Sequence, residues 1–292
     1  MAVAAVPIRI PLPASLVARL DNATPTRDLK IFLAGRPKSA GKTTFALTLP
    51  GKKLVLRYDL GLVPQVPGVE PSDIYVIGYP PANPTILGNS DRWKRATNVG
   101  ERIILDIEEI RKAFVEQRPL VFGTQSVPLP DVLILDGLTE LQAIVLDWVL
   151  GVNALTDPDE FDNRYAAWGK RLNVMRTLFN MTIPLPCTVV LIAWEIAETS
   201  GGKDPQPTGR IVPDVGGRLD NITPGKVDAA LRCYATYVGG GVRYMVQCVP
   251  DGIREWVGVR GRYGGVKEVD VTLTPGKPLP AERVFGSWKE GQ

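Results

Sequence analysis

Residues 35–43 form a glycine-rich phosphate-binding motif. They read GRPKSAGKT and fit the pattern G-x-x-x-x-G-K-[ST] without a mismatch, between a predicted apolar strand and a predicted helix. In such a motif, backbone N–H groups and the positive end of the helix surround a phosphate. The competing interpretation is a plain glycine-rich turn with an incidental lysine. Lys42 would reach the β- and γ-phosphates, Thr43 would ligate Mg²⁺, and Thr44 would contact the α-phosphate. The predicted nucleotide contacts are Gly35, Lys38, Ser39, Ala40, Gly41, Lys42, Thr43 and Thr44.

An acidic residue at the end of a second apolar strand would complete the metal site. Residues 132–136 read VLILD, so Asp136 lies at the tip of a buried strand, where it would hold Mg²⁺ directly or through water. An acid in this position is also common as a helix N-cap, but its pairing with the phosphate motif favours the metal. The next residue is Gly137, so no catalytic carboxylate directly follows Asp136.

The carboxylate that activates water must therefore come from another part of the chain. Asp59 follows a predicted strand at residues 53–58 and is the best candidate for a general base. A simple turn residue before Gly61 is the competing interpretation of Asp59. Glu140 and Glu195 are the alternatives for the same role.

Composition excludes several other kinds of chemistry. The 292 residues contain no histidine, which excludes His-ligated metal sites, Ser-His-Asp triads and histidine general bases. Three cysteines, Cys187, Cys233 and Cys248, match no zinc spacing and suggest buried thiols in a reducing compartment. The net charge of +3 permits nucleic-acid binding through a local basic surface only. No membrane span or signal-peptide pattern is found, so we expect a cytoplasmic protein.

Strands alternate with helices over much of the chain, which predicts an α/β fold with a mainly parallel central sheet flanked by helices. The later strands are separated by glycine-rich turns and predict an antiparallel C-terminal meander. Residues 199–225 are predicted to form a long loop, and the Pro-rich segment after residue 271 is predicted to be irregular. We expect parallel strands at 30–34, 53–58, 74–77, 131–136 and 188–193, helices at 43–49, 101–116, 138–149 and 165–180, and meander strands at 234–238, 242–249 and 254–259.

Three segments are predicted along the chain. Residues 1–27 form an N-terminal arm, residues 28–265 the core and residues 266–292 a C-terminal tail. In the arm, apolar residues alternate with Pro7, Arg9 and Pro11, which suits a strand at the edge of a sheet in its own subunit or a neighbour. A flexible tail that covers part of the core is the alternative.

Further segments follow the phosphate motif in a characteristic order. Residues 58–61 read YDLG, residues 134–141 read ILDGLTEL, residues 168–172 read WGKRL, and residues 189–195 read VVLIAWE. In this order they resemble the phage RecA-like core-only P-loop ATPases, a group of phage nucleotide-binding or AAA-family proteins that includes single-strand annealing recombinases. The resemblance covers about residues 29–265 and implies a RecA-like fold, the cofactors ATP and Mg²⁺, and a homo-oligomer that is a filament or a ring.

Two positions depart from the pattern of that group. The group usually has Asp-Thr-Glu-Gly-Gly after its second strand, and here the shorter Asp59 stands at the Glu position. The group commonly has histidine at the end of the sensor strand, and here Trp194 occupies that place. Tryptophan has one hydrogen-bond donor and cannot accept a proton, so the coupling of hydrolysis to DNA is expected to be weakened or changed.

The resemblance also implies residues that act beyond the phosphate motif. Arg260 and Arg262 match a basic pair that reaches the γ-phosphate of a neighbouring subunit, with a charged hairpin end as the alternative. The segment 199–225 matches a loop that contacts single-stranded DNA, and tryptophan between cations at residues 91–95 is a second candidate. The predicted nucleic-acid contacts are Lys203, Arg210, Arg218 and Lys226.

These observations lead to one principal hypothesis and three alternatives. The principal hypothesis is a Mg²⁺-dependent ATPase that acts on single-stranded DNA, together with phage recombination, repair or replication proteins, in the host cytoplasm. A DNA packaging or translocation motor, which would form a closed ring, is the first alternative. A nucleotide-binding regulatory protein with little turnover is the second. A small-molecule kinase is the third, although the long loop has few of the arginines that a kinase lid needs.

Overall fold

The computed structural model describes most of the chain. The described residues are 29–37, 40–59, 61–79, 89–153, 155, 165–200, 205–216, 225–259 and 267–289. For residues 89–97 and 287–289 the helical backbone is described without the side chains. The predicted N-terminal arm, residues 1–27, lies outside these ranges.

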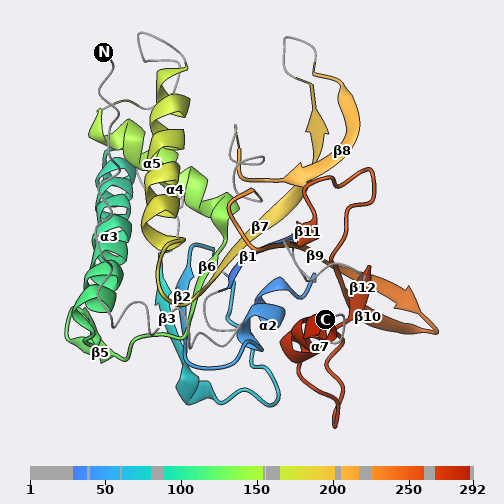
Figure 1. The fold of residues 1–292 in the computed structure, drawn as a ribbon. Coiled ribbons are helices and arrows are strands. Elements are labelled where there is room, and N and C mark those ends of the chain that lie inside the picture. Colours follow the sequence, from blue (N-terminus) through green and yellow to red (C-terminus); the bar gives the residue numbers. More distant parts are fainter. Residues whose placement is uncertain are drawn as a thin grey trace, which may run out of the picture.

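A ten-stranded sheet forms the centre of the molecule (Figure 1). Its middle strands are parallel, and antiparallel strands extend it at one edge and pair beside it. The predicted α/β sheet with antiparallel C-terminal strands is therefore confirmed. In spatial order the strands are β12 (Glu268–Asp270), β10 (Gly241–Gln247), β9 (Ala229–Val238), β1 (Lys30–Gly35), β7 (Thr188–Thr199), β6 (Val132–Asp136), β2 (Lys53–Arg57) and β3 (Ile74–Gly78), with β11 (Gly258–Val259) on β9 and β8 (Pro207–Pro213) on β7.

Each face of the sheet has its own hydrophobic core, because successive residues of a strand point to opposite faces. In β6, Leu133 and Leu135 belong to the core under the long helices, whereas Val132 and Ile134 belong to the other core. The long helices are α3 (Asn89–Glu116), α4 (Leu138–Val152) and α5 (Ala166–Thr182). The shorter helices α2 (Lys42–Leu47) and α7 (Pro280–Lys289) lie on the opposite face (Figure 1). The helix that follows the phosphate motif is therefore packed beside the C-terminal helix.

The predicted long loop at residues 199–225 contains a strand, so that part of the prediction is wrong. β7 continues to Thr199, and β8 returns antiparallel to it. Apolar residues meet across this hairpin, with Ile196 opposite Val212 and Ala197 opposite Ile211. Cross-strand apolar pairs such as Ile196 with Val212 stabilise such a ribbon, and they outweigh the Gly and Pro content that suggested a loop.

The C-terminal tail is also more ordered than predicted. The segment expected to be irregular after residue 271 includes α7, and β12 precedes it. The third meander strand is reduced to β11, which pairs with β9 rather than with β10. The sequence did not predict the small hairpin of β4 (Leu120–Phe122) and β5 (Gln125–Val127), and α3 begins earlier than expected.

Gly35 ends β1 at a point where a side chain has no room. A Cβ atom on Gly35 would lie 2.1 Å from the backbone oxygen of Cys233 in β9. We expect Gly35→Ala to lower the free energy of unfolding by about 1–3 kcal/mol, measured by urea denaturation, because the two strands must separate. Gly169 in α5 is the matched control: nothing lies within 4 Å of its Cβ, so Gly169→Ala should raise that free energy by about 0.5–1 kcal/mol. A Gly35→Ala protein as stable as the wild type would contradict the close β1–β9 contact.

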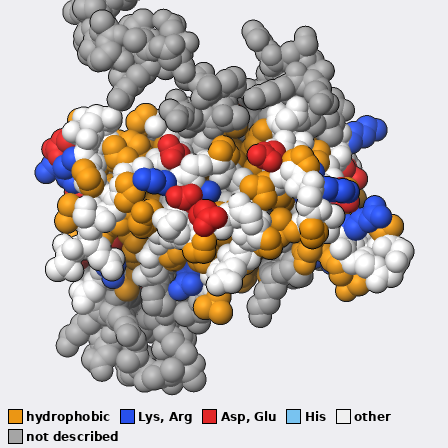
Figure 2. All heavy atoms as spheres, turned by 90° about the horizontal axis from the view of Figure 1, so that it is seen from below, with side chains coloured by type: hydrophobic (Ala, Val, Ile, Leu, Met, Phe, Trp, Pro, Cys, Tyr) orange, Lys and Arg blue, Asp and Glu red, His pale blue; other side chains and the backbone are white. Residues whose placement is uncertain are grey.

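Charges of both signs are mixed on the surface. On the face shown in Figure 2, basic side chains are interspersed with acidic and hydrophobic ones and do not gather into one basic area. A search of the described helices found none with the length and apolar character needed to cross a membrane.

Candidate functional site

Lys42 begins α2, and its ammonium group lies over the phosphate motif. Gly41, just before it, has a left-handed backbone with φ of 73°, a conformation that suits glycine and turns the loop into the helix. Lys42 Nζ donates hydrogen bonds to the backbone oxygens of Gly35 at 3.1 Å and Arg36 at 2.8 Å. Burial lowers the pKa of Lys42. The cation is thus held where little water screens it, and its attraction for a phosphate would be strong.

Thr43 and Asp136 come together across the sheet. Thr43 lies in α2, which follows β1, and Asp136 ends β6. β7 separates β1 from β6, yet Thr43 Oγ1 donates a hydrogen bond to Asp136 Oδ2 at 2.9 Å. Burial raises the pKa of Asp136 to about 6, although the hydrogen bond from Thr43 opposes the shift. A buried carboxylate with a raised pKa favours a nearby cation, because the cation stabilises its charged form.

These two side chains fit a magnesium ion that also has nucleotide ligands. A threonine hydroxyl and an aspartate carboxylate are oxygen donors, which Mg²⁺ prefers. Among the described residues, no group of three or more Cys, Asp or Glu side chains is arranged to hold a metal by itself. Mg²⁺ usually binds through one or two protein oxygens, with phosphates and water completing its shell. Thr43 and Asp136 would therefore hold the ion together with a bound triphosphate.

Two further carboxylates, Asp59 and Glu140, flank Gly137 at the end of β6. A Cβ atom on Gly137 would lie 2.8 Å from Glu140 Oε2 and 3.6 Å from the Cβ of Asp59. Glu140 Oε2 is buried without a hydrogen-bond partner, and burial raises the pKa of this side chain. Asp59 is half-buried, and its Oδ1 accepts a hydrogen bond from the backbone N–H of Gly61 at 3.1 Å. Both candidates for the general base are thus close to Asp136.

Glu195, the third candidate, is engaged elsewhere. Its carboxylate is almost completely buried and forms ion pairs with Arg232 at 3.0 Å and Arg254 at 3.5 Å. It does not line the cavity around the phosphate motif. Removing one partner of such a buried ion pair would leave an uncompensated charge, so the three side chains depend on one another. We therefore assign Glu195 a structural role and not a role in binding or hydrolysing the nucleotide.

Trp194 links the site to the segment that follows β8. Its backbone N–H donates to Thr139 Oγ1 at 3.1 Å, and this hydroxyl donates to the backbone oxygen of Asp214 at 2.9 Å. Gln142 Nε2 donates to the same oxygen at 2.9 Å, and Asp214 N–H donates to the Trp194 oxygen at 2.8 Å. Hydrogen bonds therefore join three parts into one unit: the first turn of α4, the point of β7 where its pairing with β1 ends, and the base of the β7–β8 hairpin.

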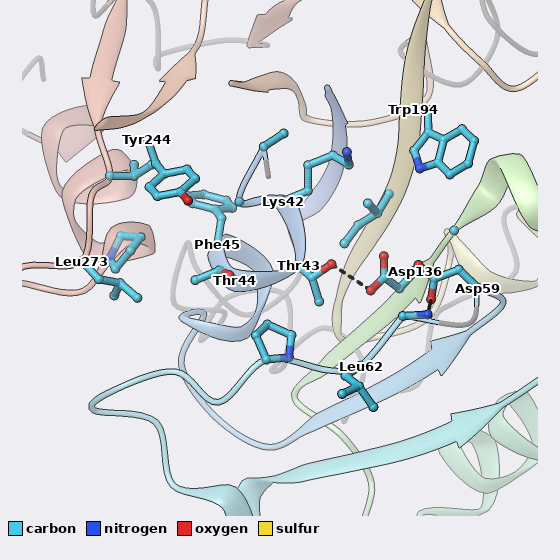
Figure 3. Close-up of a pocket in the computed structure, with 18 of the residues that line it drawn as sticks. Lys42, Thr43, Thr44, Phe45, Asp59, Leu62, Asp136, Trp194, Tyr244 and Leu273 are labelled. Carbon is cyan, nitrogen blue, oxygen red and sulfur yellow. Dashed lines mark hydrogen bonds between the residues drawn. The ribbon is translucent and has the colours of Figure 1, made fainter. Parts of the chain in front are cut away.

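The phosphate motif opens into a cavity of about 770 Å³ (Figure 3). Asp59, Asp136 and Trp194 lie at one end, and Tyr244 and Leu273 lie at the other, with residues 42–45 between them. The sequence did not predict the second end, although the helical spacing of Ala281, Val284 and Phe285 was a signal that this segment packs on the core. The predicted site residues that line the cavity are Ala40, Gly41, Lys42, Thr43, Thr44, Asp59 and Asp136.

The remaining predicted residues do not line this cavity or are not described. Arg210 lies on β8 and is 3.5 Å from Glu255, and Lys226 Nζ donates to Asn180 Oδ1 at 3.0 Å. The side chains at 91–95 fall outside the described residues. So do the phosphate-motif residues Lys38 and Ser39, the predicted catalytic pair Arg260 and Arg262, and the predicted DNA contacts Lys203 and Arg218.

The central sheet, the phosphate motif and the Thr43–Asp136 pair together define a P-loop ATPase. Residues 27–252 match the family model described as AAA domain, and the chain belongs to this family. Among solved structures, it is similar to the flagellar accessory protein FlaH from Methanocaldococcus jannaschii, with 10% sequence identity and a TM-score of 0.38 over 80% of this chain and 82% of that one. No curated protein matches the chain.

Proposed function

We propose that this ATPase acts as an oligomer on single-stranded DNA in phage recombination, repair or replication. The observation that carries the proposal is the hydrogen-bonded unit between the cavity and the β7–β8 hairpin. Trp194 lines the cavity, and its strand continues into the hairpin, whose base is held to α4 through Asp214. Because α4 starts directly after Asp136 and Gly137, a change in the phosphates or the metal would shift the hairpin.

In this proposal the site residues have separate roles in hydrolysis. Lys42 binds the β- and γ-phosphates, and Thr43 with Asp136 holds Mg²⁺, which offsets the charge of the phosphates. Asp59 removes the proton of the attacking water. Arg260 and Arg262 would come from a neighbouring subunit and stabilise the charge that develops on the transferred phosphoryl group. The oligomer, a filament or a ring, would then be needed for full activity.

The hairpin side of the molecule would supply the contacts to DNA. Arg210 and its partner Glu255 are both more than half exposed, so their ion pair contributes little and leaves the guanidinium able to bind a phosphate. Lys226 is exposed and bonded to a neutral amide, so its charge is not cancelled by that bond. Lys203 and Arg218, the other predicted DNA contacts, lie outside the described residues. Since acidic and basic side chains are mixed elsewhere, as in Figure 2, the affinity should be modest and sensitive to salt.

A matched pair of arginines tests the DNA contact. Arg210 on β8 and Arg243 on β10 have equally exposed side chains, each at 54%. Arg210→Ala should weaken binding to a fluorescent oligothymidine and reduce the slope of log K against log salt by about 1, the effect of losing one phosphate contact. Arg243→Ala should change neither quantity. Equal effects of the two substitutions would argue against a DNA surface on the hairpin.

Phosphate-release assays with and without oligothymidine test the function as a whole. We expect single-stranded DNA to raise the turnover of the wild type. Turnover that is unchanged by DNA would contradict the proposal. ATP binding with negligible hydrolysis under all conditions would instead favour a nucleotide-binding regulatory protein. The specific observation for that second candidate is Trp194, a side chain that cannot accept a proton, at the wall of the cavity.

A further inference from the structure

The cavity has an apolar end that the phosphates and the metal do not use. Tyr244 and Leu273 line this end, and Phe45 lies between it and the phosphate motif (Figure 3). Val271, whose N–H donates to the Tyr244 oxygen, and Pro280 also line the cavity. The acidic residues Asp59, Asp136 and Glu140 line the opposite end. A nucleoside triphosphate has the same division, with a charged phosphate chain at one end and a flat aromatic base at the other. The shape and chemistry of the cavity therefore match more than a phosphate group.

Tyr244 is fixed directly beside the turn that begins α2. A Cβ atom on Gly41 would lie 3.1 Å from Cδ1 of the tyrosine ring, so the ring is in close contact with the phosphate motif. The backbone of Tyr244 is held on both sides: its N–H donates to Thr272 Oγ1 at 2.9 Å, and its oxygen accepts from Val271 N–H at 2.8 Å. The ring is half-buried, so part of its surface remains able to contact a ligand.

The segment that carries Leu273 and Pro280 is anchored firmly to the core. Arg283 donates hydrogen bonds to the backbone oxygens of Asp270 and Thr272, each at 2.7 Å. Ala281 N–H donates to Thr48 Oγ1 at the end of α2 at 3.0 Å, and this bond is buried. The rings of Phe45 and Phe285 also pack together, with centroids 6.2 Å apart. The apolar wall is thus built against the same helix that starts at Lys42.

We propose that this apolar end binds the purine base of the nucleotide, with the base against the Tyr244 ring and the Leu273 side chain. The inference rests on the proposed binding of a triphosphate by residues 35–43. Aromatic stacking on Tyr244 and apolar contact with Leu273 would hold the base, because most of the side chains that line this end are apolar or aromatic. The C-terminal segment would then be part of the nucleotide site and not a separate tail.

Two ligands that differ by the nucleoside test this inference. Isothermal titration would measure the binding of Mg-ATP and of Mg-tripolyphosphate, which has the phosphates without the base. Tyr244→Ala and Leu273→Ala should weaken Mg-ATP binding by roughly 5- to 150-fold, as expected for the loss of one base contact, and leave tripolyphosphate binding unchanged. Tyr244→Phe keeps the ring and should bind Mg-ATP like the wild type. Tyr237→Ala is the matched control, because Tyr237 lies on the same hairpin and is 83% exposed.

The possible outcomes separate this inference from the proposed function. If both alanine variants at the apolar end bind Mg-ATP like the wild type, the base lies elsewhere and the inference is wrong. If both alanine variants lose affinity for tripolyphosphate and for ATP to the same extent, the substitutions act on the phosphate motif, and the inference is again wrong. If the wild type binds neither ligand, the proposed function itself fails. Thermal unfolding identifies a variant that is not folded. In that case the binding data of the other alanine variant decide whether the base lies at the apolar end.

Discussion

Replacing Lys42 by methionine is expected to reduce ATP turnover by about 10²–10³-fold. Methionine keeps the aliphatic part of the side chain and removes the ammonium group that lies over the backbone oxygens of Gly35 and Arg36. That group is poorly hydrated, as the lowered pKa indicates, so its charge would act on the phosphates with little screening. Loss of the same charge should also weaken the binding of Mg-ATP, and phosphate release with titration calorimetry measures both effects.

A second buried lysine provides the control for this prediction. Lys53 on β2 is 4% exposed, its pKa is also lowered by burial, and it lies outside the cavity. Lys53→Met removes a buried ammonium in the same way and should leave turnover per folded molecule unchanged. If Lys42→Met hydrolyses ATP within tenfold of the wild type, the ammonium does not act on the transferred phosphate.

The phosphate end of the site was predictable because its residues are local in sequence. The turn at residues 35–43 is continuous, and glycine is required at Gly41 for a positive φ and at Gly35 for the contact with β9. Asp136 was identified because it ends a buried apolar strand. The sequence did not give the strand order, in which β7 lies between β1 and β6, since pairing between distant strands depends on the whole sheet.

The apolar end was not predictable for the same reason. Tyr244 and Leu273 reach the cavity through the antiparallel pairing of β10 with β9 and β12 and through the packing of α7 on α2. The sequence predicted strands at 234–238 and 242–249, but β12 has three residues and the prolines after residue 271 suggested an irregular segment in place of α7. Their stability comes from tertiary contacts such as the Arg283 hydrogen bonds, which no local pattern of residues shows.

Changing each of the two carboxylates beside Gly137 to its amide is expected to lower kcat to very different extents. Asp59→Asn should lower kcat by about 10²–10⁴-fold, the usual contribution of a general base, and leave the affinity for Mg-ATP nearly unchanged. Glu140→Gln should lower kcat by less than about tenfold. Both side chains are half-buried and line the cavity, but Glu140 Oε2 is shielded from solvent, which leaves Asp59 better placed to contact a water molecule.

Single-turnover hydrolysis and nucleotide titration on the same preparations separate the chemical step from binding. Asp59→Glu is the informative conservative variant, because it keeps the carboxylate and should retain turnover within about tenfold of the wild type. If Glu140→Gln abolishes hydrolysis and Asp59→Asn does not, the roles are reversed, and Glu140 must move on nucleotide binding to reach the water. In that case the first turn of α4, which also holds Thr139 against Asp214, would move with it, and hydrolysis would be coupled to the β7–β8 hairpin through the general base itself.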